Sequence, residues 1–320
     1  MTSIHFCDIH SLTTDLKYMQ HRSKKAVIAA LFGNLSIAIF KLVAALFSRS
    51  SSMLAESYHS MSDTLNQVLL LYGLKRSQRE PDEWHRFGYG KEQFFWSFMV
   101  AIILFGIAGT LSVREGYHKF LHPEPISHIG LAYLAIAVGL IFEGYAFSIA
   151  IRSIRSEMKT EQHRNLLEAI KQSKDPTTLT VLFEDVIALS GLLIAAVAIT
   201  LVHFTGILIL DAIASILIGV LLMVFALILA LETKNLLVGE AVSRLKRRKI
   251  LQAVCSFSEV KEVISLKTMH LSSEEVLVTL EINYQDDLIV DELEKVNDRI
   301  EKKIIDIVPR AKVYLEAENK

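Results

Sequence analysis

The chain has 320 residues, of which 52% are hydrophobic and 22% are charged, and its formal net charge is −1 at pH 7. A nearly neutral chain lacks the excess of lysine and arginine that a phosphate-binding surface needs, which excludes nucleic acid as the main partner. The two cysteines, Cys7 and Cys255, lie far apart in the sequence, so we expect neither a disulfide framework nor a zinc ribbon.

The first 24 residues are polar and lack the short apolar core and cleavage site of a signal peptide, so we expect a cytoplasmic tail there. This tail contains His5, Cys7 and His10, three possible metal ligands within six residues. A single short segment rarely forms a closed tetrahedral metal site, and a polar tail without bound metal is the preferred interpretation.

The apolar residues are concentrated in six blocks, each near the ~20 residues that cross ~30 Å of hydrocarbon. These blocks are residues 25–47, 52–74, 94–116, 129–151, 177–202 and 206–231. Basic residues cluster before the first block, after the second and after the fourth, whereas the alternate segments carry few. The positive-inside rule then predicts a six-helix transmembrane domain over residues 25–232, in the lipid bilayer of the cell (inner) membrane, with both termini cytoplasmic.

The second apolar block contains an imidazole and a carboxylate four residues apart, His59 and Asp63. Positions i and i+4 of a helix lie on one face about a turn apart, so the two groups can bind one ion. A buried pair that only fixes helix packing is the alternative. An ionisable group at the centre of a membrane helix costs ~2.5–3.5 kcal/mol on insertion scales, which favours an ion or proton path.

Three acids on different helices are predicted to lie at similar depth. Counting ~1.5 Å per residue places Asp63, Glu143 and Asp185 in the inner half of the membrane. Glu184 adjoins Asp185 but points about 100° away from it on a regular helix, so the two serve one ion only if the helix is distorted.

The same counting places one basic and one acidic residue in the outer half of the membrane. Lys41 belongs to the first span and Asp211 to the sixth. Buried opposite charges at matching depth are expected to compensate each other, so the sequence predicts a structural salt bridge between them.

The composition becomes that of a soluble domain from about Gly239. Apolar residues recur with a period of two in the predicted strands and with a helical period in the predicted helices. The expected elements are a helix over 244–255, strands over 260–271 and 275–284, a helix over 290–308 and a strand over 312–316. This αββαβ order over residues 239–320 predicts a small cytoplasmic α+β domain with a ferredoxin-like fold.

These features together resemble the cation diffusion facilitator family of divalent-metal/proton antiporters, over nearly the whole chain. The motifs that carry the resemblance are Ser57 to Asn66, Pro81-Asp82-x-x-His85-x-Phe87-Gly88-Tyr89-Gly90-Lys91, and Asp211-x-x-x-Ser215. Phe183-Glu184-Asp185 and Thr268-Met269-His270-Leu271 look most like the branch that includes a vertebrate mitochondrial zinc transporter. The resemblance implies a transporter rather than an enzyme, and a homodimer paired through the C-terminal domain.

The resemblance implies a metal site formed by His59, Asp63 and Asp185. In family members with a well-defined site, the fifth span supplies another ligand four residues before its aspartate, but Val181 stands at that position here. Glu143 is the first candidate for the missing ligand because of its depth. Glu184 is the second.

Other metal sites of the family are less well matched. Some members bind metal in the loop before the third span with an acid and two histidines. Asp82 and His85 remain here, but Tyr89 replaces the second histidine, so a loop-packing role is expected. The C-terminal domain offers only His270 and Cys255 as strong ligands.

One imidazole with two or three carboxylates suits Zn²⁺, Mn²⁺, Fe²⁺ or Co²⁺, and the resemblance favours Zn²⁺ as the transported ion, with no cofactor. These ligands lose protons when metal binds, so we expect zinc efflux from the cytoplasm coupled to proton antiport.

A non-transporting scaffold or metal sensor with the same fold is the main alternative. An intramembrane metal hydrolase is disfavoured because the sequence has no HExxH motif, and an organic-cation transporter because no aromatic cage is found.

Overall fold

A computed structural model describes residues 31–161 and 176–318 of the chain. The predicted N-terminal ligands His5, Cys7 and His10 therefore lie outside the described residues. The chain divides into two compact units, which are described separately below. The first comprises residues 1–68 and 102–227, and the second comprises residues 69–101 and 228–320.

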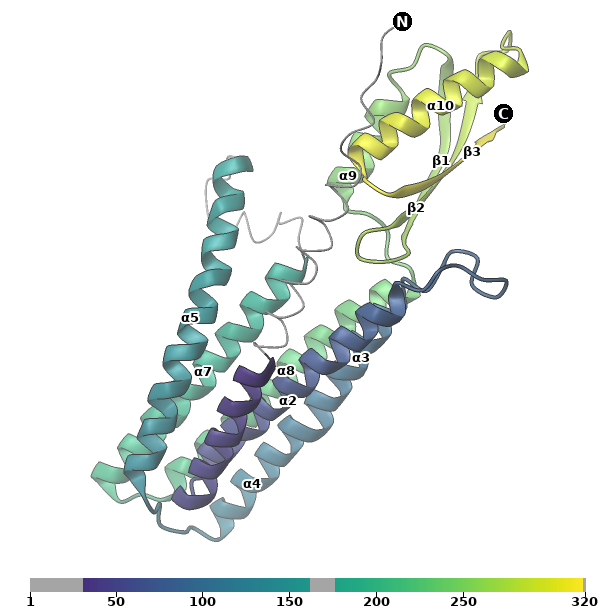
Figure 1. Ribbon diagram of the computed structural model, residues 1–320. Coiled ribbons are helices and arrows are strands. Elements are labelled where there is room, and N and C mark those ends of the chain that lie inside the picture. The colour runs from purple at the N-terminus through teal and green to yellow at the C-terminus, as the bar shows by residue number, and fades with distance from the viewer. Residues whose placement is uncertain (1–30, 162–175, 319–320) are drawn as a thin grey trace, which may run out of the picture. The chain divides into compact units, whose positions relative to one another are not determined.

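The first unit is a bundle of long helices (Figure 1). It contains the helix Leu31–Ser48 and all or part of α2 (Ser51–Ser77), α3 (Glu92–Ile103), the π-helical turn η1 (Leu104–Gly109), α4 (Thr110–Leu121), α5 (Ile129–Glu161), α7 (Pro176–Thr205) and α8 (Ile209–Val238). The elements α3, η1 and α4 follow one another without a break and form one span. Each of the six predicted apolar blocks thus overlaps a described helix.

Five of these helices are long and apolar enough to cross a membrane. Among the described long helices of the first unit, the exception is α2, which has 27 residues, about 40 Å at ~1.5 Å per residue. Its length is sufficient, but its serines and the charged residues Glu56 and Asp63 make it less apolar than the others. The predicted HxxxD pair is therefore carried by the long helix that does not qualify as a membrane span by composition.

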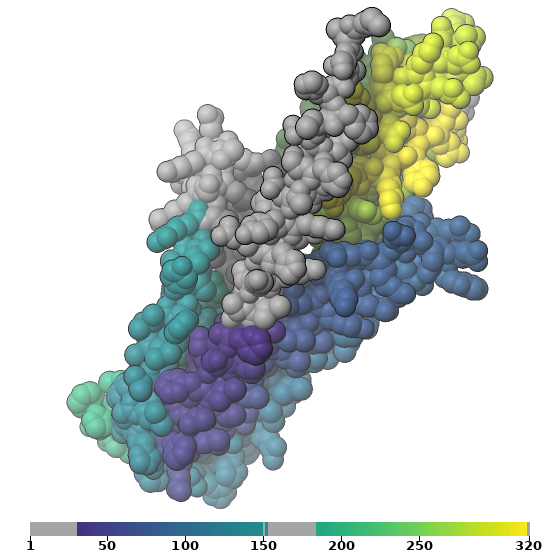
Figure 2. Space-filling view, viewed as in Figure 1, coloured from purple at the N-terminus to yellow at the C-terminus, as the bar shows by residue number. Residues whose placement is uncertain are grey.

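Small residues dominate the core of the first unit. Ala44 and Ala45 of the helix Leu31–Ser48 pack with Ala132 and Ala135 of α5 in one buried cluster. Figure 2 shows the first described helix, in purple, lying against α5, in teal. Large apolar side chains are exposed on the outside of the bundle, among them Leu46, Phe47, Ile141, Phe142, Leu193 and Leu217. This pattern, small side chains inside and large ones outside, is typical of helices packed in lipid.

The helices α4 and α8 approach each other at backbone distance. A Cβ atom on Gly116 would lie 2.7 Å from the carbonyl oxygen of Ala212, and one on Gly219 would lie 2.8 Å from the backbone of α4. Between these glycines, the Ser215 hydroxyl donates a 2.9 Å hydrogen bond to the carbonyl oxygen of Ser112. Such close contact is possible only with small residues, so α4 and α8 form a tightly joined pair.

The second unit contains the C-terminal α/β domain, in which α9 (Arg244–Val254), β1 (Val260–His270), β2 (Val276–Tyr284), α10 (Val290–Ile307) and β3 (Ala311–Ala317) follow the predicted order. The sheet order is β1-β2-β3, with β1 antiparallel and β3 parallel to β2. Side chains from α9, α10 and alternate positions of β2 share one buried core, including Ile250, Val278, Leu280 and Ile300. Both helices therefore cover the same face of the sheet.

Candidate metal site

The polar face of α2 carries the predicted site. Glu56, His59, Ser60 and Asp63 are spaced three or four residues apart, so the helical period places them on one side of α2. Glu56 is 0% and His59 1% exposed, and the Asp63 side chain is 19% exposed. Sequence reasoning assigned no role to Glu56, although its position three residues before His59 places it on the same face.

His59 and Asp63 lie together as their spacing predicts. The His59 Nδ1 atom is 3.4 Å from an Asp63 carboxylate oxygen. Neither ring nitrogen of His59 makes a hydrogen bond to the described residues, although both are buried. A buried imidazole without hydrogen-bond partners is costly unless something else satisfies it, so these nitrogens remain available to a ligand.

Asp185, on α7, also has a buried ligand atom that makes no hydrogen bond to the described residues. The residue is buried, and its Oδ2 atom has no hydrogen-bond partner among the described residues. Val181 lies one turn earlier in α7, although its side chain is outside the described part of the chain. Neighbouring Glu184 accepts a 2.9 Å hydrogen bond from the amide of Asn66, which lies three residues after Asp63 on α2. The helices α2 and α7 thus face each other through their polar side chains.

Glu143, the other candidate for the missing ligand, contacts a lysine. Its carboxylate oxygen lies 3.8 Å from the Lys41 ammonium, which also lies 3.4 Å from Glu56 and donates a 2.8 Å hydrogen bond to the Ser60 hydroxyl. The predicted Lys41–Asp211 salt bridge is therefore wrong. Lys41 instead joins the polar face of α2 to α5.

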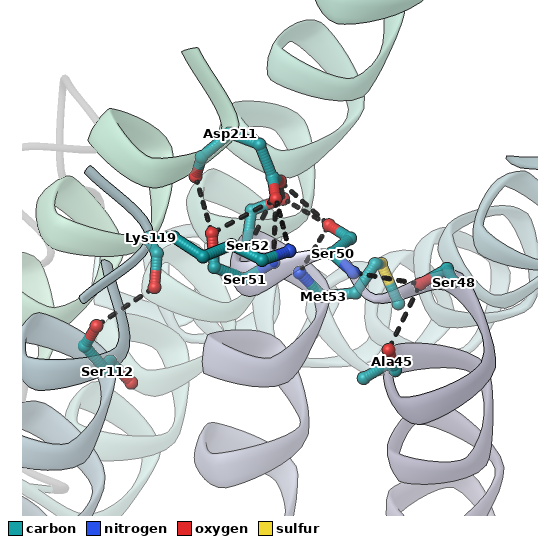
Figure 3. A network of polar contacts seen from close by, with 10 residues as sticks. Ala45, Ser48, Ser50, Ser51, Ser52, Met53, Ser112, Lys119 and Asp211 are labelled. Atoms are coloured by element: carbon teal, nitrogen blue, oxygen red, sulfur yellow. Dashed lines mark hydrogen bonds and ion pairs between the residues drawn. The ribbon is translucent and has the colours of Figure 1, made fainter. Parts of the chain in front are cut away.

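Asp211 forms a separate network at the start of α2 (Figure 3). Its buried carboxylate accepts hydrogen bonds from the hydroxyl groups of Ser50, Ser51 and Ser52 and from the backbone N–H groups of Ser51 and Ser52. Its charge partner is Lys119 on α4, at 3.8 Å. A carboxylate at a helix N-terminus satisfies free N–H groups and interacts favourably with the helix dipole. Asp211 therefore caps α2 from a neighbouring helix.

The predicted site residues form contacting pairs rather than a closed metal cluster. Within residues 31–161 and 176–318, no three His, Cys, Asp or Glu side chains are gathered closely enough to hold a metal ion. His59 and Asp63 lie together on α2, Glu184 of α7 is hydrogen-bonded to Asn66 of α2, and Asp185 is buried on α7. Glu143 is instead engaged by Lys41.

The loop before α3 uses its acid for internal contacts. One oxygen of Asp82 accepts hydrogen bonds from the backbone N–H groups of Trp84 and His85, and the other accepts one from the Tyr89 hydroxyl at 2.5 Å. These contacts, with that of Tyr89 the strongest, lower the pKa of Asp82 to about 2. The carboxylate therefore stays charged over the whole physiological pH range, and its bonding positions are occupied within the loop, in line with the expected loop-packing role.

Helices of membrane-spanning length define a multi-pass membrane protein, and buried carboxylates, an imidazole and an ammonium group lie inside its helical bundle. Comparison with known families specifies the class further. The model of the cation efflux transmembrane domain matches residues 27–238, and that of the cation efflux protein cytoplasmic domain matches residues 242–320. The chain belongs to the cation efflux family, which confirms the resemblance found in the motifs.

Three relatives illustrate the similarity. The proton-coupled zinc antiporter SLC30A9, mitochondrial, of Xenopus laevis is 29% identical over 93% of this chain and 52% of its own length. The metal tolerance protein C4 of Arabidopsis thaliana is 31% identical, with coverages of 85% and 59%. The zinc transporter ZitB of Yersinia pestis is 28% identical, with coverages of 81% and 76%. The chain thus spans little more than half the length of the first two relatives.

Proposed function

We propose that this protein is a proton-coupled exporter of divalent metal ions, with Zn²⁺ as the transported ion. The observation that carries the proposal is a set of buried ligand atoms on α2 and α7 that make no hydrogen bond to the described residues: both ring nitrogens of His59 and Oδ2 of Asp185. Zn²⁺ accepts imidazole and carboxylate ligands together. The names of the relatives from Xenopus laevis and Yersinia pestis, a zinc antiporter and a zinc transporter, support zinc as the substrate.

His59, Asp63 and Asp185 supply one nitrogen donor and two carboxylates to the ion in this proposal. The two carboxylates balance the charge of a divalent cation, and the neutral imidazole adds a directional ligand. Protons and metal compete for these same groups, because each ligand must be deprotonated to bind. Loading the site with metal therefore releases protons, and protonation releases metal, which is the chemical basis of exchange.

Glu184 is the fourth donor that the contacts favour. It contacts α2 through Asn66, three residues after Asp63, whereas Glu143, preferred from depth alone, is within ion-pair distance of Lys41. The amide of Asn66 holds Glu184 on the side of α7 that faces α2. A ligand from this position compensates for Val181 without requiring a second histidine.

The proposal places six spans in the membrane, with α2 as the sixth despite its polarity, because its charged face is turned toward other helices. Both termini are cytoplasmic, and the cell (inner) membrane is the proposed location. The names of the SLC30A9 relatives contain the word mitochondrial, so cell fractionation with an organelle marker is the appropriate check. The C-terminal domain is proposed to adopt a ferredoxin-like fold and to pair two copies of the chain.

The decisive experiment is metal flux in sealed vesicles that contain the purified full-length protein. We expect an imposed pH gradient to drive Zn²⁺ transport, and competition with Mn²⁺, Fe²⁺ and Co²⁺ to rank the four ions. The His59→Ala variant should bind Zn²⁺ more weakly and transport it more slowly. If the folded protein binds metal but moves none under any gradient, the alternative of a scaffold or metal sensor replaces the proposal.

A further inference from the structure

Lys41 is a fully buried ammonium group held by oxygen atoms of two neighbouring helices. Its Nζ atom lies 2.8 Å from the Ser60 hydroxyl, 3.4 Å from a Glu56 carboxylate oxygen and 3.8 Å from a Glu143 carboxylate oxygen. Both Lys41 and Glu56 are 0% exposed, so bulk solvent does not contact them. Two carboxylates and a hydroxyl around one positive charge are an arrangement that also suits a metal cation.

Two glycines on neighbouring helices provide the space that the Lys41 and Glu56 side chains occupy. A Cβ atom on Gly191 of α7 would lie 2.1 Å from Oε1 of Glu56, and one on Gly139 of α5 would lie 3.1 Å from Cε of Lys41. Any larger residue at Gly191 would occupy the position of the Glu56 carboxylate. The space for the buried pair is therefore formed by α5 and α7 as well as by α2.

One oxygen atom of this arrangement lacks a hydrogen-bond partner among the described residues. Oε1 of Glu56 is buried but makes no hydrogen bond to the described residues. Glu56 lies on the same face of α2 as His59, one turn away, so the oxygen cluster around Lys41 adjoins the proposed metal site. A metal ion that passes His59 is thus close to a second set of anionic oxygens.

We propose that Lys41 is a tethered cation that occupies a second cation-binding position, formed by Glu56, Ser60 and Glu143, and thereby keeps a second divalent ion out. The proposal rests on the proposed metal transport, because only a cation carrier has an ion to exclude. The lysine neutralises the two acids without leaving the protein. A metal ion bound by the same oxygens would be trapped beside the transport site, whereas the ammonium group, fixed to its helix, cannot dissociate.

Removal of the lysine tests the proposal through the number of metal ions bound. Purified full-length protein is dialysed against Zn²⁺, and bound zinc per chain is measured by elemental analysis. We expect Lys41→Met to bind one more Zn²⁺ per chain than the wild type, because Glu56 and Glu143 lose their cation. The double variant Lys41→Met/Glu56→Gln should return to the wild-type number, and so should Lys41→Arg.

Lys119→Met is the matched control, because Lys119 is also a buried lysine paired with an acid, Asp211, but that acid caps the first residues of α2, Ser51 and Ser52. It should bind the wild-type number of ions. If Lys41→Met binds no more zinc than the wild type, the proposal is overturned. If the wild type itself binds no zinc, the proposed function fails first, so the two failures are distinguishable.

Stability provides a second readout if Lys41→Met folds poorly without metal. Zn²⁺ should then raise its thermal unfolding temperature by more than it raises that of the wild type, since the ion replaces the missing charge. Mg²⁺ at the same concentration controls for ionic strength. A Lys41→Met protein that Zn²⁺ stabilises no more than the wild type, or that remains unfolded with Zn²⁺ present, contradicts the proposal.

Discussion

The proposed mechanism depends first on individual acidic residues whose negative charge balances the positive charge of the bound ion. Asp63 and Asp185 are the two carboxylates of the proposed ligand set, and neither is engaged by a lysine or arginine among the described contacts. Replacing either with asparagine keeps the shape of the side chain but removes its charge. The packing of α2 and α7 should therefore survive a change that the bound ion does not tolerate.

We expect Asp63→Asn and Asp185→Asn each to reduce Zn²⁺ transport in vesicles to the background of empty vesicles, while both proteins remain folded. The loss follows from removing a negative charge that offsets the ion in a low-dielectric site. Asp286→Asn makes the same change at an exposed position of the C-terminal domain and should transport normally. Wild-type rates in either membrane variant would remove that residue from the site.

The fourth ligand gives a second prediction at this scale. Glu184→Gln should weaken Zn²⁺ affinity by at least roughly 10–100-fold, the cost of losing an outer-shell partner of a metal ligand, because a direct donor is removed here. Glu143→Gln should leave the affinity nearly unchanged, because Lys41 holds that carboxylate. Adding Val181→His to Glu184→Gln should recover part of the loss by supplying a ligand one turn before Asp185. Calorimetric titration measures all three, and a large loss in Glu143→Gln would make Glu143 the ligand.

The sequence predicted some of these residues well and others poorly, for one physical reason. Helical periodicity places His59 and Asp63 on one face without any knowledge of the fold, and the structure has them 3.4 Å apart. Depth counting, in contrast, locates a residue along a helix but not the direction in which it points. It therefore paired Lys41 with Asp211, whereas each has other partners.

At the scale of elements, Asp211 determines where α2 begins. Five hydrogen bonds from Ser50, Ser51 and Ser52 converge on its carboxylate. Because α2 carries His59 and Asp63, the same contacts fix the position of those residues relative to α8. The run of three serines gave no signal of this role in the sequence, since serine is common in loops and only the fold shows what its hydroxyl groups meet.

Loss of this cap should lower the stability of the protein, and it removes no proposed metal ligand. At about 0.6 kcal/mol for each hydrogen bond between membrane helices, five bonds contribute about 3 kcal/mol. Asp211→Ala should therefore lower the thermal unfolding temperature in detergent clearly, and Asp211→Asn, which keeps one acceptor oxygen, should lower it less. Equal effects of the two variants would show that the hydrogen bonds are not what stabilises the start of α2.

The close contact between α4 and α8 leads to a prediction about the stability of two glycine variants, one of which serves as the control. Gly116→Ala adds a Cβ atom 2.7 Å from a backbone oxygen of α8, which cannot move aside as a flexible side chain can. It should destabilise the protein and reduce transport. Gly106→Ala lies in the same span but has open space around it, so it should be neutral or slightly stabilising. Unfolding temperatures of the two variants, measured side by side, test whether the close approach is required.

The ends of the predicted apolar blocks differ from the observed ends of the helices. The predicted block 129–151 corresponds to a helix that continues to Glu161, and the block 206–231 corresponds to one that continues to Val238. An apolar window ends where a helix leaves the lipid, but the backbone hydrogen bonds of the helix do not end there. The order of elements in the C-terminal domain was predicted in full, because the change from a period of two to a helical period is visible in the sequence itself.

At the scale of the whole molecule, the sheet of the C-terminal domain has one face that its own helices do not cover. The helices α9 and α10 bury the side that carries Val278 and Leu280. On the other side, Leu277 is half-buried and Tyr314 is 55% exposed. Among the described strands, β1 and β3 have no further neighbour at the edges of the sheet, and a small domain with such edges and a partly apolar open face gains stability by pairing. The match to a cation efflux cytoplasmic domain is consistent with this use.

We therefore expect the 320-residue chain to form a dimer of 36.0 kDa chains when its mass in detergent is measured by light scattering. Tyr314→Arg places a charge on the open face and should shift the equilibrium toward monomer as the protein is diluted. Val290→Arg introduces the same charge at an exposed position at the start of α10, away from that face, and should leave the dimer intact. If Tyr314→Arg remains a dimer at every concentration, the chains pair through another surface, and the sheet edge formed by β1 becomes the next one to test.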